Sequence, residues 1–312
     1  RYVSTPKELG YSLINADISN PLADMYVKNS VTHKTSLTGS FGVGVQIFKG
    51  LSYKLNVAGS YYTTNGYTHT PQYATYWDEN GSPDSRFSHP YTSLSESRNE
   101  GLNYNIDNLL TYKGSFGDHN FDVLLGTSWM REFYRTMSIS SGVNDLGSPS
   151  VTTYNGAGTV GSNEANSALL SFFARVNYNY LNRYLLSLSI RSDESSKFAK
   201  GHRVGYFPSV SAGWNVHEEK FFKIPWMSKL KLRASYGQLG ANFIDPYSFL
   251  NLAYGPVPAI MGGKRQYGYV TRLAQGDLKW ETAVSSNFGI ETAFLNNSLT
   301  FTAEYFYRKN RD

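Results

Sequence analysis

The sequence has no cysteine, no long apolar run and almost no helical pattern. Without cysteine there is no disulfide scaffold, no thiolate zinc site and no cysteine nucleophile. No segment approaches the roughly 18 consecutive apolar residues that a membrane helix needs. The net charge of +5 is small, and the lysines and arginines form no run. Nucleic acid is therefore not an expected partner.

Aromatic residues, by contrast, are abundant, with 25 Tyr, 18 Phe and 5 Trp among 312 residues. A tyrosine ring is apolar and its hydroxyl is polar, so tyrosine is favoured where an apolar layer meets water. Seven tyrosines lie at the ends of expected strands, as a membrane-interface girdle requires: Tyr61, Tyr62, Tyr112, Tyr178, Tyr180, Tyr184 and Tyr236.

Apolar and polar residues alternate with period two along much of the chain, which predicts β-strands with one apolar and one polar face. Ten segments show this pattern: Ser36–Phe48, Leu51–Tyr62, Gly101–Gly114, Asn120–Trp129, Ala168–Tyr180, Arg183–Arg191, Val204–His217, Lys229–Gly237, Val284–Phe294 and Ser298–Arg308. We expect strands of about nine to twelve residues, the length that a tilted membrane strand needs.

Short and long connections take turns between these segments. Short ones are expected at Lys49-Gly50, Ser115–His119, Leu181-Asn182 and Asn296-Asn297, and long ones at Thr63–Asn99, Arg135–Ser167 and Gln238–Ala283. Outer-membrane barrels have such short periplasmic turns and long external loops. A soluble β-sandwich or propeller also alternates apolar and polar residues. Long strands, charges at mid-strand and tyrosines at strand ends favour the membrane barrel.

The segment Val204–His217 illustrates the two expected faces. Its first set is assigned to lipid: Val204, Tyr206, Val210, Ala212, Trp214 and Val216. Its second set is assigned to the lumen: Ser209, Ser211, Gly213, Asn215 and His217. Pro208 lacks a backbone N–H, so we expect a bulge or a break in strand pairing there.

Several stretches resemble the SusC/RagA family of TonB-dependent outer-membrane transporters of Bacteroidota. The run Asn182–Phe222, "NRYLLSLSIRSDESSKFAKGHRVGYFPSVSAGWNVHEEKFF", resembles the family's signature turn and the strand that follows it. Further resemblances, in chain order, are Asn20–Ala23, His119–Gly126, Leu230–Asn242 and Gly276–Lys309. Glu194 stands where the family usually has glycine, and Leu239 and Ala241 also depart from its pattern.

The resemblance implies an all-β fold, an antiparallel transmembrane β-barrel of 22 strands that is filled by a plug domain. About ten of those strands are expected here, in one partial barrel domain over residues 1–312. The plug and the TonB box are not in this sequence. The chain begins at Arg1 without Met or a signal peptide, so we expect a piece of a longer polypeptide.

The function that the resemblance implies is active import across the bacterial outer membrane. Expected partners are a SusD-like surface lipoprotein, TonB through a segment absent here, membrane lipid, and an oligosaccharide or oligopeptide cargo. One alternative is a structural or accessory barrel subunit of a larger outer-membrane complex, and another is a passive porin. No catalytic triad or other nucleophile–base set has recognisable spacing, so an enzyme is not expected.

Aromatic residues in the expected external loops are candidates for contact with cargo or with the lipoprotein, because flat rings suit sugar rings and peptide side chains. They are Tyr73, Tyr76, Trp77, Tyr91, Tyr254 and Tyr267. Packing within the loop is the simpler alternative.

Three further motifs are weak. Gly156–Gly161 has dinucleotide-binding spacing but no expected flanking strand and helix. His217–Phe222 lacks the second histidine of a zinc protease. Asp78–Asp84 has alternating oxygen ligands that suit Ca²⁺, although an Asn-Gly turn explains it more simply. We therefore expect no cofactor, with Ca²⁺ as the one weak candidate.

Overall fold

The computed structural model describes residues 3–4, 28–74, 88–89, 91–141, 158–250, 252–262, 264–272 and 278–311. Apart from a single turn of 3-10 helix, η3 (Val216–Glu218), the regular structure of these residues is all strand. The strands are β1 (Val3–Ser4), β2 (Asn29–Phe48), β3 (Leu51–Thr70), β4 (Tyr73–Ala74), β5 (Ser93–Phe116), β6 (His119–Ser141), β7 (Thr159–Tyr180), β8 (Tyr184–Ser195), β9 (Val204–Asn215), β10 (Met227–Ala241), β11 (Leu252–Met261), β12 (Lys264–Arg272), β13 (Glu281–Phe294) and β14 (Leu299–Arg311).

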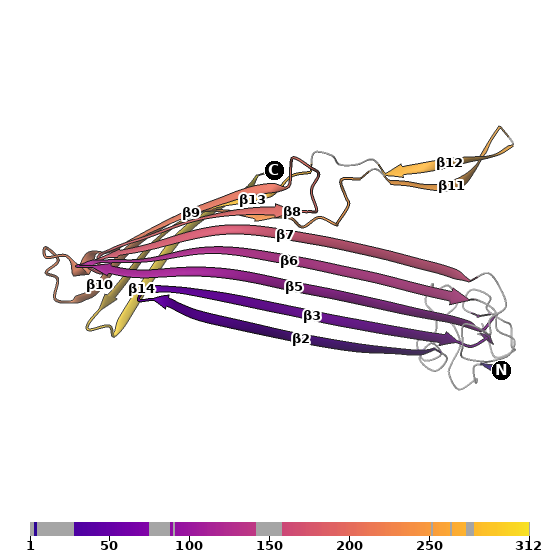
Figure 1. The fold of residues 1–312 in the computed structure, drawn as a ribbon, viewed down its shortest axis with the longest axis horizontal. Helices are drawn as coiled ribbons and strands as arrows, with labels where there is room; N and C mark the ends of the chain where they lie inside the picture. Colours follow the sequence, from indigo (N-terminus) through magenta and orange to yellow (C-terminus); the bar gives the residue numbers. More distant parts are fainter. Residues whose placement is uncertain are drawn as a thin grey trace. The chain divides into compact units, whose positions relative to one another are not determined.

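Ten of these strands form one sheet in the order β14-β13-β10-β9-β8-β7-β6-β5-β3-β2. Each contains one of the ten predicted segments or most of it, so the all-β prediction is confirmed (Figure 1). Successive strands of the sheet are neighbours, with two exceptions: β4, which pairs with β1, lies between β3 and β5 in the chain, and the hairpin β11-β12 is inserted between β10 and β13. The sheet is open within the described residues, with β2 and β14 at its edges.

Tight turns connect the strands at one end of the sheet, which we call the turn end (Figure 1). Gly50 has a φ of 90°, and Asn182 and Asn296 have φ values of 58° and 54°. Glycine and asparagine tolerate this left-handed conformation better than other residues. The predicted positions of the short connections are therefore confirmed.

The predicted strand lengths are wrong for half of the sheet. Strands β2, β3, β5, β6 and β7 have 20 to 24 residues, about twice the expected length. β3 and β5 continue into the predicted loop Thr63–Asn99, and β6 and β7 into the predicted loop Arg135–Ser167, while β2 begins at Asn29, seven residues before its predicted segment. The third predicted loop contains the hairpin β11-β12.

The chain divides into two compact units. Unit 1 comprises residues 1–39, 60–103 and 133–165, and unit 2 comprises residues 40–59, 104–132 and 166–312. Unit 1 has a small core that includes Tyr73, Ala74 and Leu94. The core of unit 2 is an aromatic cluster of Phe198, Phe207 and Trp280.

Strand β9 confirms one part of the detailed prediction and corrects two others. Val204, Tyr206 and Val210 are exposed on the apolar face, as expected. Val216 does not lie on that face of a strand, because it begins η3 and is buried. Pro208 interrupts pairing on one side only: the ladder with β8 runs through it without a shift, whereas the ladder with β10 ends at Ser209.

Candidate functional site

The apolar face of unit 2 carries a belt of aromatic rings at the turn end. Its members form three separate runs of contacting rings, with ring centroids 4.6 to 6.4 Å apart in each pair. The contacting pairs are Phe48–Tyr112, Tyr112–Phe121, His119–Tyr180, Tyr180–Tyr184, Tyr184–Trp214 and Trp226–Phe294. This arrangement is typical of side chains at a membrane–water interface.

A second set of aromatic rings lies eight residues along the strands from this belt. Tyr104 and Trp129 form an edge-to-face pair with centroids 5.4 Å apart. Tyr206 belongs to the same set and is 66% exposed. The eight-residue pairs are Tyr104–Tyr112, Phe121–Trp129 and Tyr206–Trp214. Exposed aliphatic side chains fill the space between the two sets, among them Leu188, Ile190 and Val210. The apolar face thus has the two girdles and the apolar band of a membrane barrel.

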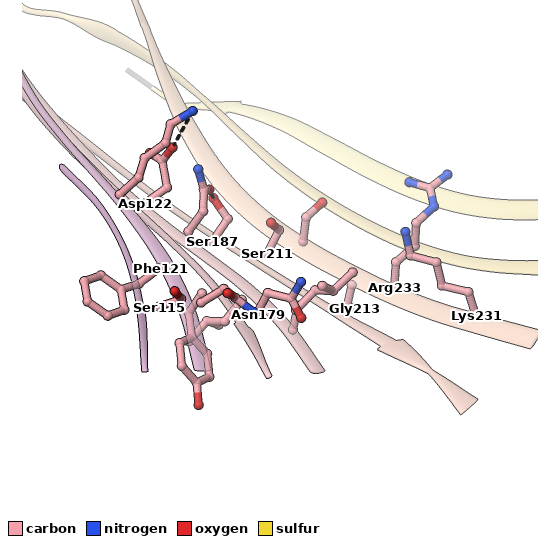
Figure 2. Close-up of a pocket in the computed structure, with 18 of the residues that line it drawn as sticks. Ser115, Phe121, Asp122, Asn179, Ser187, Ser211, Gly213, Lys231 and Arg233 are labelled. Atoms are coloured by element: carbon pink, nitrogen blue, oxygen red, sulfur yellow. Dashed lines mark hydrogen bonds and ion pairs between the residues drawn. The ribbon is translucent and has the colours of Figure 1, made fainter. Parts of the chain in front are cut away.

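The opposite face of unit 2 carries charged and small polar side chains, and these help to line a groove of about 760 Å³ whose lining also includes Phe121, Leu185 and Ala234 (Figure 2). Small polar side chains cross its floor in register on five neighbouring strands, β7, β8, β9, β10 and β13: Asn177, Ser187, Ser211, Ser235 and Asn287. Ser187 donates a hydrogen bond of 2.7 Å to Asn177. Asn287 Oδ1 is buried and has no hydrogen-bond partner within the described residues.

Charged side chains from β10, β13 and β14 form a network beside this groove. Lys229 Nζ lies 2.8 Å from Glu291 Oε2, and Arg233 Nε lies 3.3 Å from Glu291 Oε1. Arg233 also pairs with Glu304 on β14. At the other side of the groove, Lys113 pairs with Asp122 at 3.7 Å (Figure 2). Such charges are stable in a strand only where water or polar partners reach them, which excludes lipid from this face.

The signature-like run Asn182–Phe222 forms a buried anchor at the other end of β8 and β9. Phe198 is completely buried and packs against Trp280, whose indole donates a 2.8 Å hydrogen bond to Arg203 O. Phe207 contacts the same indole edge-to-face. Gly240 lies directly against the Phe207 ring, where a Cβ atom would collide with it. The residues of the signature-like run therefore stabilise the fold by packing in this buried cluster.

The charged residues of the same run are also engaged. Arg191 pairs with Asp193 at 2.7 Å and donates a 2.9 Å hydrogen bond to Ser171. Asn242, just after β10, donates to Ser195. Glu194, the departure from the family pattern, lies in β8 and pairs with Leu170 and Val204 in the sheet. The strand therefore continues through the position where the family usually has glycine.

The six aromatic candidates are only partly described. The side chain of Tyr73 is 9% exposed and contacts His89 edge-to-face, and Tyr91 is 57% exposed. Tyr76 and Trp77 lie outside the described residues. Tyr254 is in β11 and Tyr267 in β12, and only their backbone is described. Their contact with cargo or lipoprotein stays a prediction.

The three weak motifs gain no support. In Gly156–Gly161, residues 159–161 already belong to β7, so this part is strand instead of the expected loop. His217 hydrogen-bonds Leu230 O at 3.1 Å. Asp78–Asp84 lies outside the described residues, so the Ca²⁺ prediction is untested. Within the described part of the chain, no three His, Cys, Asp or Glu side chains gather as a metal site. No helix of that part is long and apolar enough to cross a membrane.

Sequence reasoning missed the register of the polar groove and the aromatic cluster. Serines at matching positions in Arg183–Arg191, Val204–His217 and Lys229–Gly237 were visible, but pairing partners were needed to align them. The cluster joins Phe198 to Trp280, 82 positions apart, and periodicity carries no signal for such a contact.

Comparison with known proteins identifies the family. Residues 4–312 match the model of the TonB dependent receptor-like β-barrel family. The chain belongs to this family. The barrels of this family are parts of outer-membrane transport proteins, which supports the expectation that the chain is not an enzyme.

Individual relatives share about a third or less of their residues with this chain. The TonB-dependent receptor P3 of Formosa agariphila is 33% identical over 66% of this chain. The TonB-dependent receptor SusC of Bacteroides thetaiotaomicron is 29% identical over 94% of it. These matches confirm the predicted SusC-like resemblance. The chain spans 21% of the length of the first relative and 29% of the second.

A solved structure of the RagAB peptide transporter has the same fold. It superposes with a TM-score of 0.80 at 22% identity, over 96% of this chain and 33% of that one. The ten strands described here therefore have the arrangement of part of a TonB-dependent receptor barrel.

Proposed function

We propose that the chain is part of the barrel wall of an outer-membrane importer for large nutrients. The supporting observation is the contrast between the two faces of unit 2. One is apolar and bordered by aromatic rings, while the other carries ion pairs and a row of small serine and asparagine side chains. A sheet with these faces suits lipid on one side and a filled, water-lined lumen on the other.

The polar face favours a filled lumen over an open pore. Its floor is made of small serine and asparagine side chains, which let another backbone approach closely. A plug segment or a polar cargo would supply hydrogen bonds at this wall. In this proposal TonB drives import through a segment outside this chain.

The cargo is an oligosaccharide or an oligopeptide, and a SusD-like lipoprotein covers the external side. One relative is named SusC, and the likeness in fold is to a peptide transporter. The exposed ring of Tyr91 is the described candidate for contact on that side.

Growth of the source bacterium tests the proposal. Deletion of the full-length gene should abolish growth on one class of oligosaccharide or oligopeptide, and disruption of TonB should have the same effect. Uptake that persists without TonB would support a passive porin. Unchanged uptake of every cargo, with stable association to other outer-membrane proteins, would support an accessory subunit.

Topology is tested separately with the full-length protein in intact cells. A cysteine in place of Gly158 should react with an impermeant thiol reagent, and a cysteine in place of Asn296 should not. Asn296 lies in a tight turn at the turn end, which the proposal places in the periplasm. Labelling of the Asn296 variant from outside would contradict this orientation.

A further inference from the structure

One connection at the turn end differs from all the others there. Residues 216–226, which we call the aromatic turn, join β9 to β10. The neighbouring connections 49–50, 117–118, 181–183 and 295–298 have two to four residues. A hairpin needs no more than that to reverse direction. The extra residues of the aromatic turn therefore require another explanation.

The aromatic turn folds onto the apolar face of the sheet. Glu219 Oε1 accepts hydrogen bonds from the Tyr184 hydroxyl at 2.6 Å and from the Trp214 indole at 3.0 Å, and both donors belong to the aromatic belt. Phe221 contacts Trp214 edge-to-face with centroids 6.4 Å apart. Trp226 stacks on Phe294 at 5.7 Å. The turn therefore continues the belt beyond the ends of the strands.

Large apolar side chains of the aromatic turn remain open in spite of these contacts. Phe221 is 67% exposed, Trp226 58% and Ile224 37%. The four tight turns have little room for such a group of side chains. Exposed apolar groups that continue an interfacial belt are favourable in the boundary between lipid headgroups and acyl chains, where rings are half wet.

The charges of the turn point to the headgroup that it contacts. Glu219 is occupied by Tyr184 and Trp214 and lies 3.8 Å from Arg183. Glu218 lies 3.5 Å from His217. Lys220 and Lys223 are exposed, and neither makes an ion pair with another described residue. Two exposed lysines that make no ion pair with another described residue, beside exposed apolar side chains, match an anionic phosphate above acyl chains.

We propose that the aromatic turn is a lipid anchor that binds an anionic phospholipid of the leaflet at the turn end. Phe221, Ile224 and Trp226 lie at the acyl-chain boundary, while Lys220 and Lys223 contact the phosphate. The proposal rests on the membrane placement of the barrel given under Proposed function.

The first part of the proposal, that the apolar side chains of the aromatic turn lie at the acyl-chain boundary, is tested by measuring how deeply they enter the bilayer. Single cysteines replace Phe221, Val210 or Asp118 on a cysteine-free background of the full-length protein, and each is labelled with bimane in nanodiscs. Brominated phosphatidylglycerol should quench the label at position 221 and at position 210, which is the mid-band control on β9. The label at position 118, in a tight turn, should remain unquenched.

The controls separate two failures. Quenching at position 210 without quenching at position 221 would overturn the lipid anchor and leave the barrel in the membrane. Absence of quenching at both positions would overturn the membrane placement itself, and with it the proposed function.

The headgroup half is tested by comparing brominated phosphatidylglycerol with brominated phosphatidylcholine, using the label at position 221. Quenching should favour phosphatidylglycerol, and the double variant Lys220→Gln/Lys223→Gln should reduce this preference by about thirtyfold at low salt. Lys113→Gln, on the polar face, is the matched control and should leave the preference unchanged. Equal quenching by both lipids in the protein with both lysines would overturn the proposal.

Discussion

Strands β2, β3, β5, β6 and β7 have 20 to 24 residues, whereas β8, β9, β10, β13 and β14 have 12 to 15. Both groups start at the same row of turns. The short strands end near the buried cluster around Phe198. The long strands extend further from the turns and remain paired by backbone hydrogen bonds. One group therefore ends in packed side chains, and the other extends its backbone pairing. Substitutions in the two groups should differ accordingly.

The largest effect is expected in the short group. Phe198→Ala removes a completely buried ring that packs against Trp280. The loss should be about 3–5 kcal/mol of unfolding free energy, because the cavity cannot be refilled by neighbouring aromatic rings. Urea unfolding of the full-length protein in detergent or lipid measures it. Met137→Ala, at an exposed position of β6, is the control. Equal losses in both variants would contradict the comparison.

A charge introduced on the apolar face should have different effects in two places: in the apolar band between the two sets of aromatic rings, and in the part of the long strands beyond that band. Val210 lies midway between Tyr206 and Trp214, and Val210→Arg should cost about 2–4 kcal/mol in a bilayer. Val31→Arg, 17 residues from the turn-end residue Phe48 on β2, should cost close to nothing. Folding titrations in lipid vesicles compare the two. A large cost at position 31 would show that lipid also covers the long strands there.

A pH effect is expected at the aromatic turn. Hydrogen bonds from Tyr184, and next from Trp214, hold the pKa of Glu219 below its ordinary value of 4.5. A lowered pKa in the folded state means that Glu219 stabilises the fold above pH 4.5 and loses this contribution as the pH falls through the lowered value. Glu219→Gln should reduce the fall in unfolding temperature between neutral pH and about pH 3. Glu218→Gln is the control, and an equal change in both variants would contradict the assignment.

The smallest effect is expected in the long group. Arg135 on β6 pairs with Glu164 at 2.8 Å and with Glu100 at 3.7 Å, and all three are exposed or partly exposed. Because solvent screens such pairs, Arg135→Gln should change stability only slightly, and added salt should remove the difference. Thermal unfolding at low and high ionic strength measures this. A loss comparable to that of Phe198→Ala would show that the extension is held by charge.

The same contrast explains what could be predicted from the sequence. Alternation located all ten strands of the sheet, because an apolar face and a polar face impose a period of two. It failed beyond Tyr62 on β3 and before Gly101 on β5, where residues such as Thr63, Asn65 and Ser97 make both faces polar. Strands without an apolar face show no such period, and their ends could not be placed.

The candidate site was less predictable than the fold. Turn chemistry was readable at Lys49-Gly50 and Asn296-Asn297, since glycine and asparagine favour positive φ. The polar groove required the alignment of five strands, and Trp280 required a contact with a turn far away in sequence. These features depend on register and tertiary packing.

The eight-residue spacing of the aromatic pairs acts as a ruler for bilayer thickness. At about 3.3 Å per residue it measures about 26 Å along a strand, which becomes about 20 Å across the bilayer for a strand tilted by about 40°. The bacterial outer membrane is thinner than average, so this span suits it. In a bilayer of longer acyl chains, the distance between the aromatic belt and the second set of rings would be shorter than the apolar layer is thick. The adjacent lipid would then have to thin locally so that both sets of rings lie at its two interfaces.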